Sequence, residues 1–153
     1  MATTAGRRAV TFARLDEVMP DVERLLQGYT TVGRWSLGQI CNHLAMAVNG
    51  SIDGSPAKAP WLVRTLVAPI VLRKLLKSET MPEGVKVPES VLPKPGLDDR
   101  AEAEALRAAL KRFAEHTGAL VDHPFFGPLG RDRWDHLNRI HCAHHLSFAR
   151  PGS

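Results

Sequence analysis

Near the C-terminus the chain reads RDRWDHLNRIHCAHHLSF, residues 131–148. Large side chains recur in this stretch at every third or fourth position, which is the spacing of one face of an α-helix. The inward-facing stripe reads Trp134, Leu137, His141, His144 or His145, and Phe148. Histidine therefore stands where leucine would pack, and the pattern predicts a helix from about Arg131 to Ser147 that turns imidazole rings toward the core.

A second helix is predicted to open at residues 36–39, SLGQ. This sequence has the form of a capping box, in which the serine hydroxyl accepts from the third backbone amide and the glutamine reaches back to the serine amide. Beyond the cap, helical spacing is kept by Ile40, His43, Leu44 and Ala47. His43 thus lies on the core-facing stripe, where an imidazole needs a polar partner.

Two more helices complete the pattern. One runs from about Asp16 to Gln27, and the other begins at Asp98 or Asp99, either of which can cap it, and ends near His116. Their apolar stripes are Val18, Val22, Leu25 and Leu26 in the first, and Ala103, Leu106, Leu110 and Phe113 in the second. Met81–Gly96 carries four prolines and is expected to be a long extended connection. These features predict an all-α fold, a four-helix bundle with a long crossover connection.

A further segment, from Ala57 to Lys77, is strongly apolar but is interrupted by an arginine and a proline. A bilayer-spanning helix needs about 20 nearly uncharged residues, so this segment is not a convincing span. It predicts an extra apolar helix, kinked at the proline, that covers the bundle. The alternative is a basic amphipathic segment on a membrane or a partner subunit, because Arg73, Lys74 and Lys77 suit anionic lipid as well as a helix C-terminus.

Composition limits the classes of protein that the chain can belong to. Its 153 residues, 44% of them hydrophobic, predict one helical domain over residues 12–150 after a flexible N-terminal tail, residues 1–11. The formal charge of +4 comes from cations scattered among acids, so nucleic acid is not expected as a partner. Residues 1–8 lack a signal-peptide pattern, and the two cysteines, Cys41 and Cys142, fit a reducing compartment. Cytoplasmic residence is therefore predicted, with both thiols buried.

The strongest functional signal is the pair His141 and His145. Four residues along an α-helix are about 400° of rotation and about 6 Å of rise, so the two rings project one above the other. One divalent ion can reach both, with His43 from a facing helix as the third ligand. No glutamate lies between the pair, which argues against a zinc protease. The sequence predicts a three-histidine site for nickel, zinc, iron or manganese, with a coordination position left open for water.

Other histidines and two tryptophans surround this prediction. His144 lies about 100° around the helix from His145 and is the candidate catalytic residue, because an imidazole that titrates near pH 6.5 can transfer protons. His123 precedes a proline in a turn, where a structural hydrogen bond is expected. Trp35 and Trp134 are expected as core or rim anchors, and either could line the mouth of the site.

Several segments resemble the DinB-like superfamily of four-helix-bundle proteins, in particular a branch known only as a domain of unknown function. They are GRWSLGQICNHLA at residues 33–45, Met81-Pro82, His123-Pro124, Phe126-Gly127 and HCAHHLSF at residues 141–148. The resemblance spans about Phe12 to Pro151. It implies that one histidine of the second helix and two of the last helix bind a divalent metal, and these match His43, His141 and His145. It also implies transferase or isomerase chemistry with low-molecular-weight thiols such as bacillithiol or mycothiol, and a homodimer. The final histidine of many members is followed by Arg-Gly-Gln, whereas here Leu-Ser-Phe follows.

Two classes of function remain open from the sequence. The first is a metal-dependent transferase or hydrolase that acts on a small molecule, with a low-molecular-weight thiol as cosubstrate. The second is a non-catalytic helical interaction module with a structural or vestigial metal site. A membrane-surface role is a third interpretation that rests on the apolar segment alone.

Overall fold

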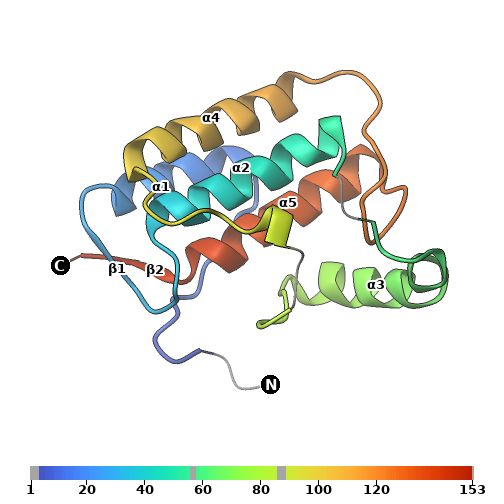
Figure 1. Cartoon of the computed structure of the whole chain (residues 1–153), viewed down its shortest axis with the longest axis horizontal. Helices are drawn as coiled ribbons and strands as arrows, with labels where there is room; N and C mark the ends of the chain where they lie inside the picture. Colours follow the sequence, from blue (N-terminus) through green and yellow to red (C-terminus); the bar gives the residue numbers. More distant parts are fainter. Residues whose placement is uncertain (1–3, 56–57, 86–88, 153) are drawn as a thin grey trace.

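The computed structural model describes residues 4–55, 58–85 and 89–152, and this part of the chain is mostly helical (Figure 1). Its helices are α1 (Val18–Leu25), α2 (Leu37–Asp53), α3 (Ala68–Ser78), α4 (Asp99–Glu115) and α5 (Gly130–Leu146). Two short strands, β1 (Tyr29–Thr31) and β2 (Ala149–Pro151), pair antiparallel. Three of the four main helices, α1, α4 and α5, lie within about two residues of both predicted ends, and α2 begins within one residue of its predicted start. The small sheet was not predicted.

Helices α1, α2, α4 and α5 pack around a shared core, with α2 between α4 and α5 (Figure 1). Their inward stripes supply the largest fully buried side chains, which include Val18, Val22, Leu25, Ile40, Leu44, Leu106, Phe113 and Leu146. Complete burial of one such side chain stabilises the fold by about 1.5–3 kcal/mol. The predicted stripes therefore form the core, and α2 is the helix that contacts both of its long neighbours.

The start of α2 is fixed by contacts of its first turn. Ser36 Oγ accepts from the Gln39 amide at 3.2 Å, and Gln39 Oε1 accepts from the Ser36 amide at 3.0 Å, so the predicted capping box is confirmed. Asp99 Oδ1 accepts from the Gly38 amide at 2.6 Å, and a Cβ on Gly38 would meet that oxygen at 3.0 Å. The glycine lets the α4 N-terminus approach, while Asp98 caps α4 by accepting from the Ala101 amide at 2.8 Å.

The β1–β2 pair joins the segment before α2 to the segment after α5. Its register places Tyr29 opposite Pro151 and Thr31 opposite Ala149. The pairing is continued by the Val32 amide, which donates to the Phe148 carbonyl at 2.9 Å. Such pairing has no signature in the helical pattern, because three-residue strands are too short for a period-two alternation to be visible.

The first described residues also contact the helices. Arg8 forms an ion pair with Asp21 of α1 and donates from Nε to the Ala149 carbonyl at 2.6 Å. Arg7 forms an ion pair with Glu83 and donates from Nε to Ser147 Oγ at 2.9 Å. These residues belong to the segment 1–11 expected as a flexible tail, of which residues 1–3 lie outside the described part.

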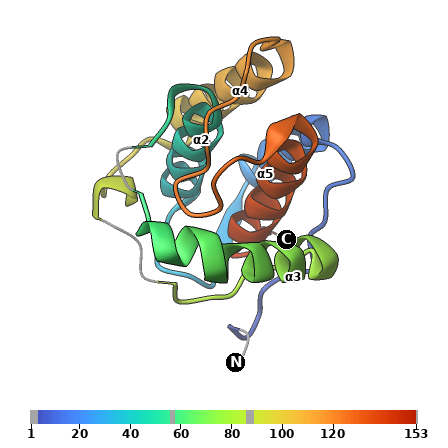
Figure 2. The ribbon, with the colours of Figure 1, turned by 90° about the vertical axis from the view of Figure 1, so that its right-hand side faces the viewer.

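The apolar segment forms the extra helix that was predicted. It is helical from Trp61, includes a π-helical turn, Val63–Val67, and continues as α3, while its predicted start at Ala57 lies outside the described residues. Pro69 stands in the first turn of α3, where the missing N–H of proline is tolerated. The π-helical turn ends at Val67, directly before α3. Figure 2 shows α3 crossing the molecule beside α5. Among the described residues, the helices lack the length and apolarity needed to cross a bilayer.

The connection from α3 to α4 contains the expected extended chain and one short 3₁₀ turn, Glu89–Val91. Pro88, one of the prolines behind that prediction, lies outside the described residues. The turn brings the Val91 backbone to α2, where its carbonyl meets a histidine. The connection thus takes part in the candidate site.

Candidate metal centre

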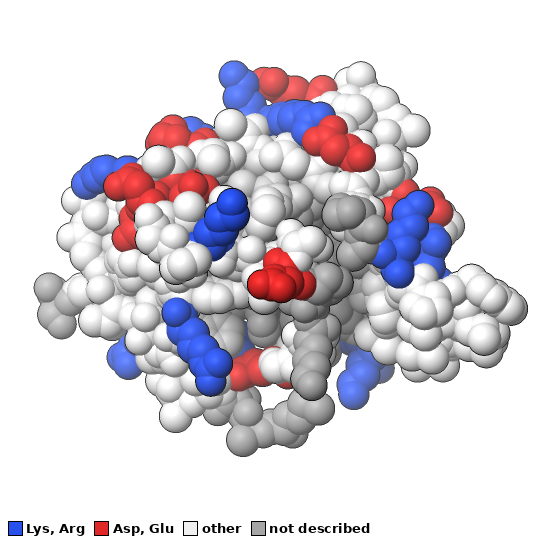
Figure 3. Space-filling view, viewed as in Figure 1, with Lys and Arg blue, Asp and Glu red and all other residues white. Residues whose placement is uncertain are grey.

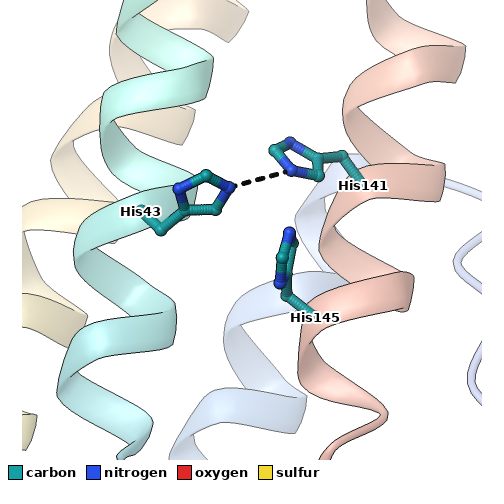
Figure 4. Close-up of side chains that lie close together, drawn as sticks. All are labelled: His43, His141 and His145. Carbon is teal, nitrogen blue, oxygen red and sulfur yellow. Dashed lines mark hydrogen bonds between the residues drawn. The ribbon is translucent and has the colours of Figure 1, made fainter. Parts of the chain in front are cut away.

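His43 is held by α2 on the side that faces α5. Its side chain is buried, with 8% exposed. Its Nδ1 lies 2.9 Å from the Val91 carbonyl oxygen, which can only accept, so Nδ1 carries the proton. In the neutral ring Nε2 then has a free lone pair, and this nitrogen points toward α5 (Figure 4).

His141 and His145 project from α5 toward His43 (Figure 4). The Nε2 atoms of His43 and His141 lie 3.2 Å apart, and one ring nitrogen from each of the three histidines lies within 4.8 Å of the others. Two imidazole nitrogens bound to one tetrahedral zinc ion at 2.0–2.1 Å would be about 3.3 Å apart. The structure therefore brings together the three residues predicted as ligands, at spacings that suit one metal ion.

Protonation favours this use of the three rings. Burial lowers the pKa of His43, although its hydrogen bond to Val91 acts in the opposite direction. Burial, and next the charge of neighbouring imidazoles, hold the pKa of His141 and His145 well below the usual range. All three rings are thus neutral at neutral pH, so a divalent ion need not displace protons from them.

Trp35 forms one wall of the cluster. Its ring stacks on His145, with centroids 5.3 Å apart and an interplanar angle of 16°, and lies 5.1 Å from the His43 ring. Trp134 lies elsewhere: it is buried, its Nε1 donates to the Val121 carbonyl at 3.0 Å, and its ring is 5.0 Å from His123. Of the two tryptophans, Trp35 borders the site and Trp134 is a core anchor.

His123 has the structural role that was predicted. Its Nδ1 accepts from the amides of Phe125 and Phe126, both at 3.1 Å. Burial, and then the nearby charge of Arg64, lower the pKa of His123 to about 4. The neutral ring therefore fixes the turn that leads into α5.

His144 lies outside the three-histidine cluster. Its Nδ1 is 3.4 Å from an Arg7 guanidinium nitrogen, its ring also hydrogen-bonds the Met81 backbone, and it meets the His145 ring edge-on at 4.9 Å. Burial, and then the Arg7 charge, lower the pKa of His144 to about 4. The ring is therefore neutral at neutral pH, and the catalytic role of His144 stays a prediction. His144 packs against His145 through the edge-on ring contact.

Both cysteines are buried, and neither belongs to the cluster. Burial raises the pKa of Cys41 and of Cys142 to about 12. The thiols stay protonated at neutral pH, and a protonated thiol is a poor metal ligand.

Three groups on or beside the two histidine-bearing helices were missed by sequence reasoning. The first is the Val91 carbonyl, a backbone group that every residue type offers. The second is Arg7, which donates to Ser147 Oγ and lies 4.1 Å above the Phe148 ring although it stands 140 residues before Ser147. The third is Asn138, which is buried and whose Nδ2 has no hydrogen-bond partner among the described residues. Asn138 could have been found, because it precedes His141 by three residues and His145 by seven, which is helical spacing.

A family model described as "Protein of unknown function (DUF1569)" matches residues 4–152. The chain belongs to the DUF1569 family. The matched range includes Arg7, Trp35, Asn138 and the three clustered histidines. No curated protein and no solved structure matches the chain. The description of DUF1569 assigns no activity, so the chemistry of this DUF1569 protein has to be argued from its own residues.

Proposed function

We propose that this DUF1569 protein is a DinB-like four-helix bundle whose His43, His141 and His145 bind a divalent metal. We further propose that the loaded site acts on a small molecule, in a transfer that uses a low-molecular-weight thiol or in a hydrolysis. The observation that carries the proposal is the approach of His43 Nε2 to His141 Nε2 at 3.2 Å while His43 Nδ1 donates to Val91.

Two arrangements can account for this approach. If His141 carries its proton on Nε2, it donates an ordinary hydrogen bond to the lone pair of His43 Nε2; if both nitrogens are unprotonated, a metal ion between them would accept both lone pairs. A proton would satisfy His43 and His141 but would leave His145 without a role, although its ring nitrogen lies within the same 4.8 Å cluster. A metal ion would use all three rings, which is why we favour it.

The donor set suits a site that reacts with an exogenous molecule. Structural zinc sites are closed by four protein ligands, whereas the cluster in the described residues offers three. When bound, a divalent ion at three histidines supplies Lewis acidity at an open position, where water or a thiol is made more acidic. Beside the cluster the Val91 carbonyl fixes the His43 tautomer, and Trp35 stacks on the His145 ring.

The alternative is a non-catalytic helical module with a structural or vestigial metal site. It is favoured by the lowered pKa of His144, about 4, which leaves that residue neutral when a general acid would be needed. The two proposals differ in one outcome: a metal-loaded module would bind no thiol or substrate at the ion, whereas an enzyme would.

The test is elemental analysis of the purified, tag-free protein together with His43→Ala, His145→Ala and His136→Ala variants. His136 is the matched control, because it lies on α5 but pairs with Glu79 outside the cluster. We expect about one equivalent of nickel, zinc, iron or manganese in the parent and in the control, and a loss in both cluster variants. A folded parent that holds no metal and takes up no added divalent ion would overturn the proposal.

If metal is found, a cobalt-substituted sample extends the test to chemistry. We expect the visible absorption of bound cobalt to change when a low-molecular-weight thiol is added, because a thiolate that enters the open position alters the ligand field. A spectrum that no thiol alters, together with no turnover in transfer or hydrolysis assays, would favour the non-catalytic module.

A further inference from the structure

The outer side of the segment 61–70 exposes more apolar surface than any comparable stretch of the described chain. The exposed fractions are 71% for Trp61, 52% for Leu62, 64% for Leu66, 48% for Val67 and 71% for Ile70. Elsewhere, the large hydrophobic residues exposed in the described part are scattered singly, at Met46, Val85 and Leu92. Scattered apolar residues are ordinary, whereas a group of five on one continuous helical segment marks an interaction surface.

This surface is held outward by a well-packed inner side. Ala68, Leu72 and Leu75 are buried against the molecule. Arg64 pairs with Asp122 at 3.2 Å, and the Ala59 amide donates to the Pro124 carbonyl at 2.9 Å, so the start of the segment is tied to the loop before α5. In Figure 2 α3 lies at the outside of the molecule. The exposed residues therefore belong to a fixed helix with a free outer side.

Positive charge is concentrated on the same segment. From Gly54 to Ser78 the chain contains five cations and no aspartate or glutamate. These five exceed the formal charge of +4 of the whole protein, so the remaining chain is slightly acidic on balance. Arg73, Lys74 and Lys77 are exposed, and none of them has an ion-pair partner among the described residues. Figure 3 shows the part of the surface over α3 as largely uncharged, with basic side chains beside it.

We propose that this face, the α3 face, formed by Trp61, Leu62, Leu66, Ile70, Arg73, Lys74 and Lys77, docks onto an anionic lipid surface. The helix would lie in the plane of the interface, with its apolar residues at the boundary between headgroups and acyl chains. Tryptophan prefers this boundary, and cations at the end of the helix would meet lipid phosphates and carboxylates. The proposal is independent of the metal site.

The excess of positive charge on this segment favours an anionic lipid surface over a second copy of the chain as the partner of the α3 face. In a twofold dimer through this face, each copy would contribute the same acid-free basic segment, and no carboxylate of the segment could pair with the partner's cations. An anionic bilayer supplies the missing negative charge together with an apolar phase. Lipid therefore complements both halves of the face, whereas a second copy complements only the apolar half.

The experiment is sedimentation of the full-length protein with vesicles of phosphatidylcholine alone or of phosphatidylcholine mixed with phosphatidylserine. Two variants test the two halves of the face: Leu66→Glu with Ile70→Glu, and Arg73→Gln with Lys74→Gln and Lys77→Gln. The matched control is Arg100→Gln with Lys111→Gln and Arg133→Gln, which removes three exposed cations from α4 and α5. All these positions are exposed, so each variant is expected to fold, and its metal content is measured alongside.

We expect the parent and the control to bind the phosphatidylserine vesicles at low salt, and the binding to weaken as salt is raised. The charge variant should bind on the order of 100-fold more weakly, since each cation near an anionic surface contributes about fivefold. The apolar variant should lose binding, and the fluorescence shift of Trp61 on binding should vanish in a Trp61→Phe variant. Metal content should stay at the parent's level throughout.

Three results would overturn the proposal. One is a parent that fails to sediment with phosphatidylserine vesicles at low salt. A second is equal loss of binding in the control, which would make the effect one of overall charge. The third is a concentration-dependent dimer that is abolished by Leu66→Glu with Ile70→Glu while the vesicles stay unbound, which would assign the face to a second copy of the chain. A parent protein that contains no metal but still binds the vesicles would contradict the proposed function and would not affect this inference.

Discussion

The contact between α2 and α5 and the α3 face depart from ordinary patterning in opposite directions. Between α2 and α5, imidazole rings occupy positions where apolar side chains would pack; on the α3 face, apolar side chains are exposed. The histidines have partners inside the protein, namely the Val91 carbonyl, Trp35 and one another. The four apolar residues of the α3 face, by contrast, are each more than 50% exposed in the described part of the chain. A buried polar group thus points to a ligand within the fold, and an exposed apolar group points to one outside it.

Metal removal should have the largest effect on the internal region. A ligand that binds only the folded state at a thousand times its dissociation constant stabilises that state by about 4 kcal/mol. We therefore expect a chelator to lower the thermal midpoint of the metal-loaded parent and to leave His43→Ala unchanged. Differential scanning calorimetry measures both, and an equal response of the two proteins would place the stabilising ion elsewhere.

Truncation of one leucine in each region gives the next contrast. Leu44, beside His43, is fully buried, whereas Leu66 is 64% exposed. We expect Leu44→Ala to lower the free energy of unfolding by about 3 kcal/mol. Leu66→Ala should change it by less than about 0.5 kcal/mol. Urea denaturation followed by circular dichroism distinguishes the two, and a large cost at Leu66 would mean that the α3 face is covered in solution.

Acid should destabilise the metal-free protein through its histidines. The folded-state pKa values of His43, His141 and His145 lie below the ordinary value, so between the two values the unfolded chain binds protons that the folded chain does not. The free energy of unfolding should thus fall as pH drops below about 6.5, by about 1.4 kcal/mol per pH unit for each such ring.

Glu83 does not interfere in that range, because its pKa is lowered to about 2 and its contribution is lost only as pH falls from about 4.5 toward 2. Denaturation at pH 7.5 and 5.5 in the presence of chelator is the measurement. A His145→Gln variant should show a smaller dependence, and equal stability of the parent at both pH values would contradict the assignment of neutral buried rings.

The smallest effect concerns the N-terminal arginines. Arg7 is largely buried, with 14% of its side chain exposed, and it joins Glu83 to Ser147. We expect Arg7→Gln to cost about 1 kcal/mol of unfolding free energy, because partly buried partners lose charged hydrogen bonds. Arg14→Gln is the control, since its pair with Asp16 is exposed and should contribute close to zero. Equal effects in the two variants would mean that the first residues do not hold α5.

Local signals were the ones that sequence reasoning could use. Helical spacing gave the four main helices, the pattern at Ser36 gave the start of α2, and the interval between His141 and His145 gave two of the clustered rings. The grouping of His141 and His145 with His43 in one site also depended on the family resemblance, because seven histidines can be combined into many sets of three.

What escaped prediction depends on long-range contacts. The Val91 carbonyl reaches His43 across 48 residues through a backbone atom, and no residue type marks such a contact. The β1–β2 pairing and the position of Arg7 are likewise decided by how the chain ends meet. For α3, spacing could predict a helix but not its exposure, because a segment that is apolar on nearly every side does not show which side will be covered.

The short β1–β2 pairing has a consequence for the choice of ion. It connects the chain just before α2 with the chain just after α5, and so it links the two helices that carry the clustered histidines. A slip of α5 by one residue is a displacement of about 1.5 Å along its axis and would break the pairing. The pairing thus fixes the spacing of α2 and α5 at one end. Metal ions of different radius would then have to be accommodated by rotation of the imidazole rings. We expect ions of similar radius to exchange at this site without a change in helix spacing, so that abundance in the cell, more than the fold, would decide which metal the protein carries.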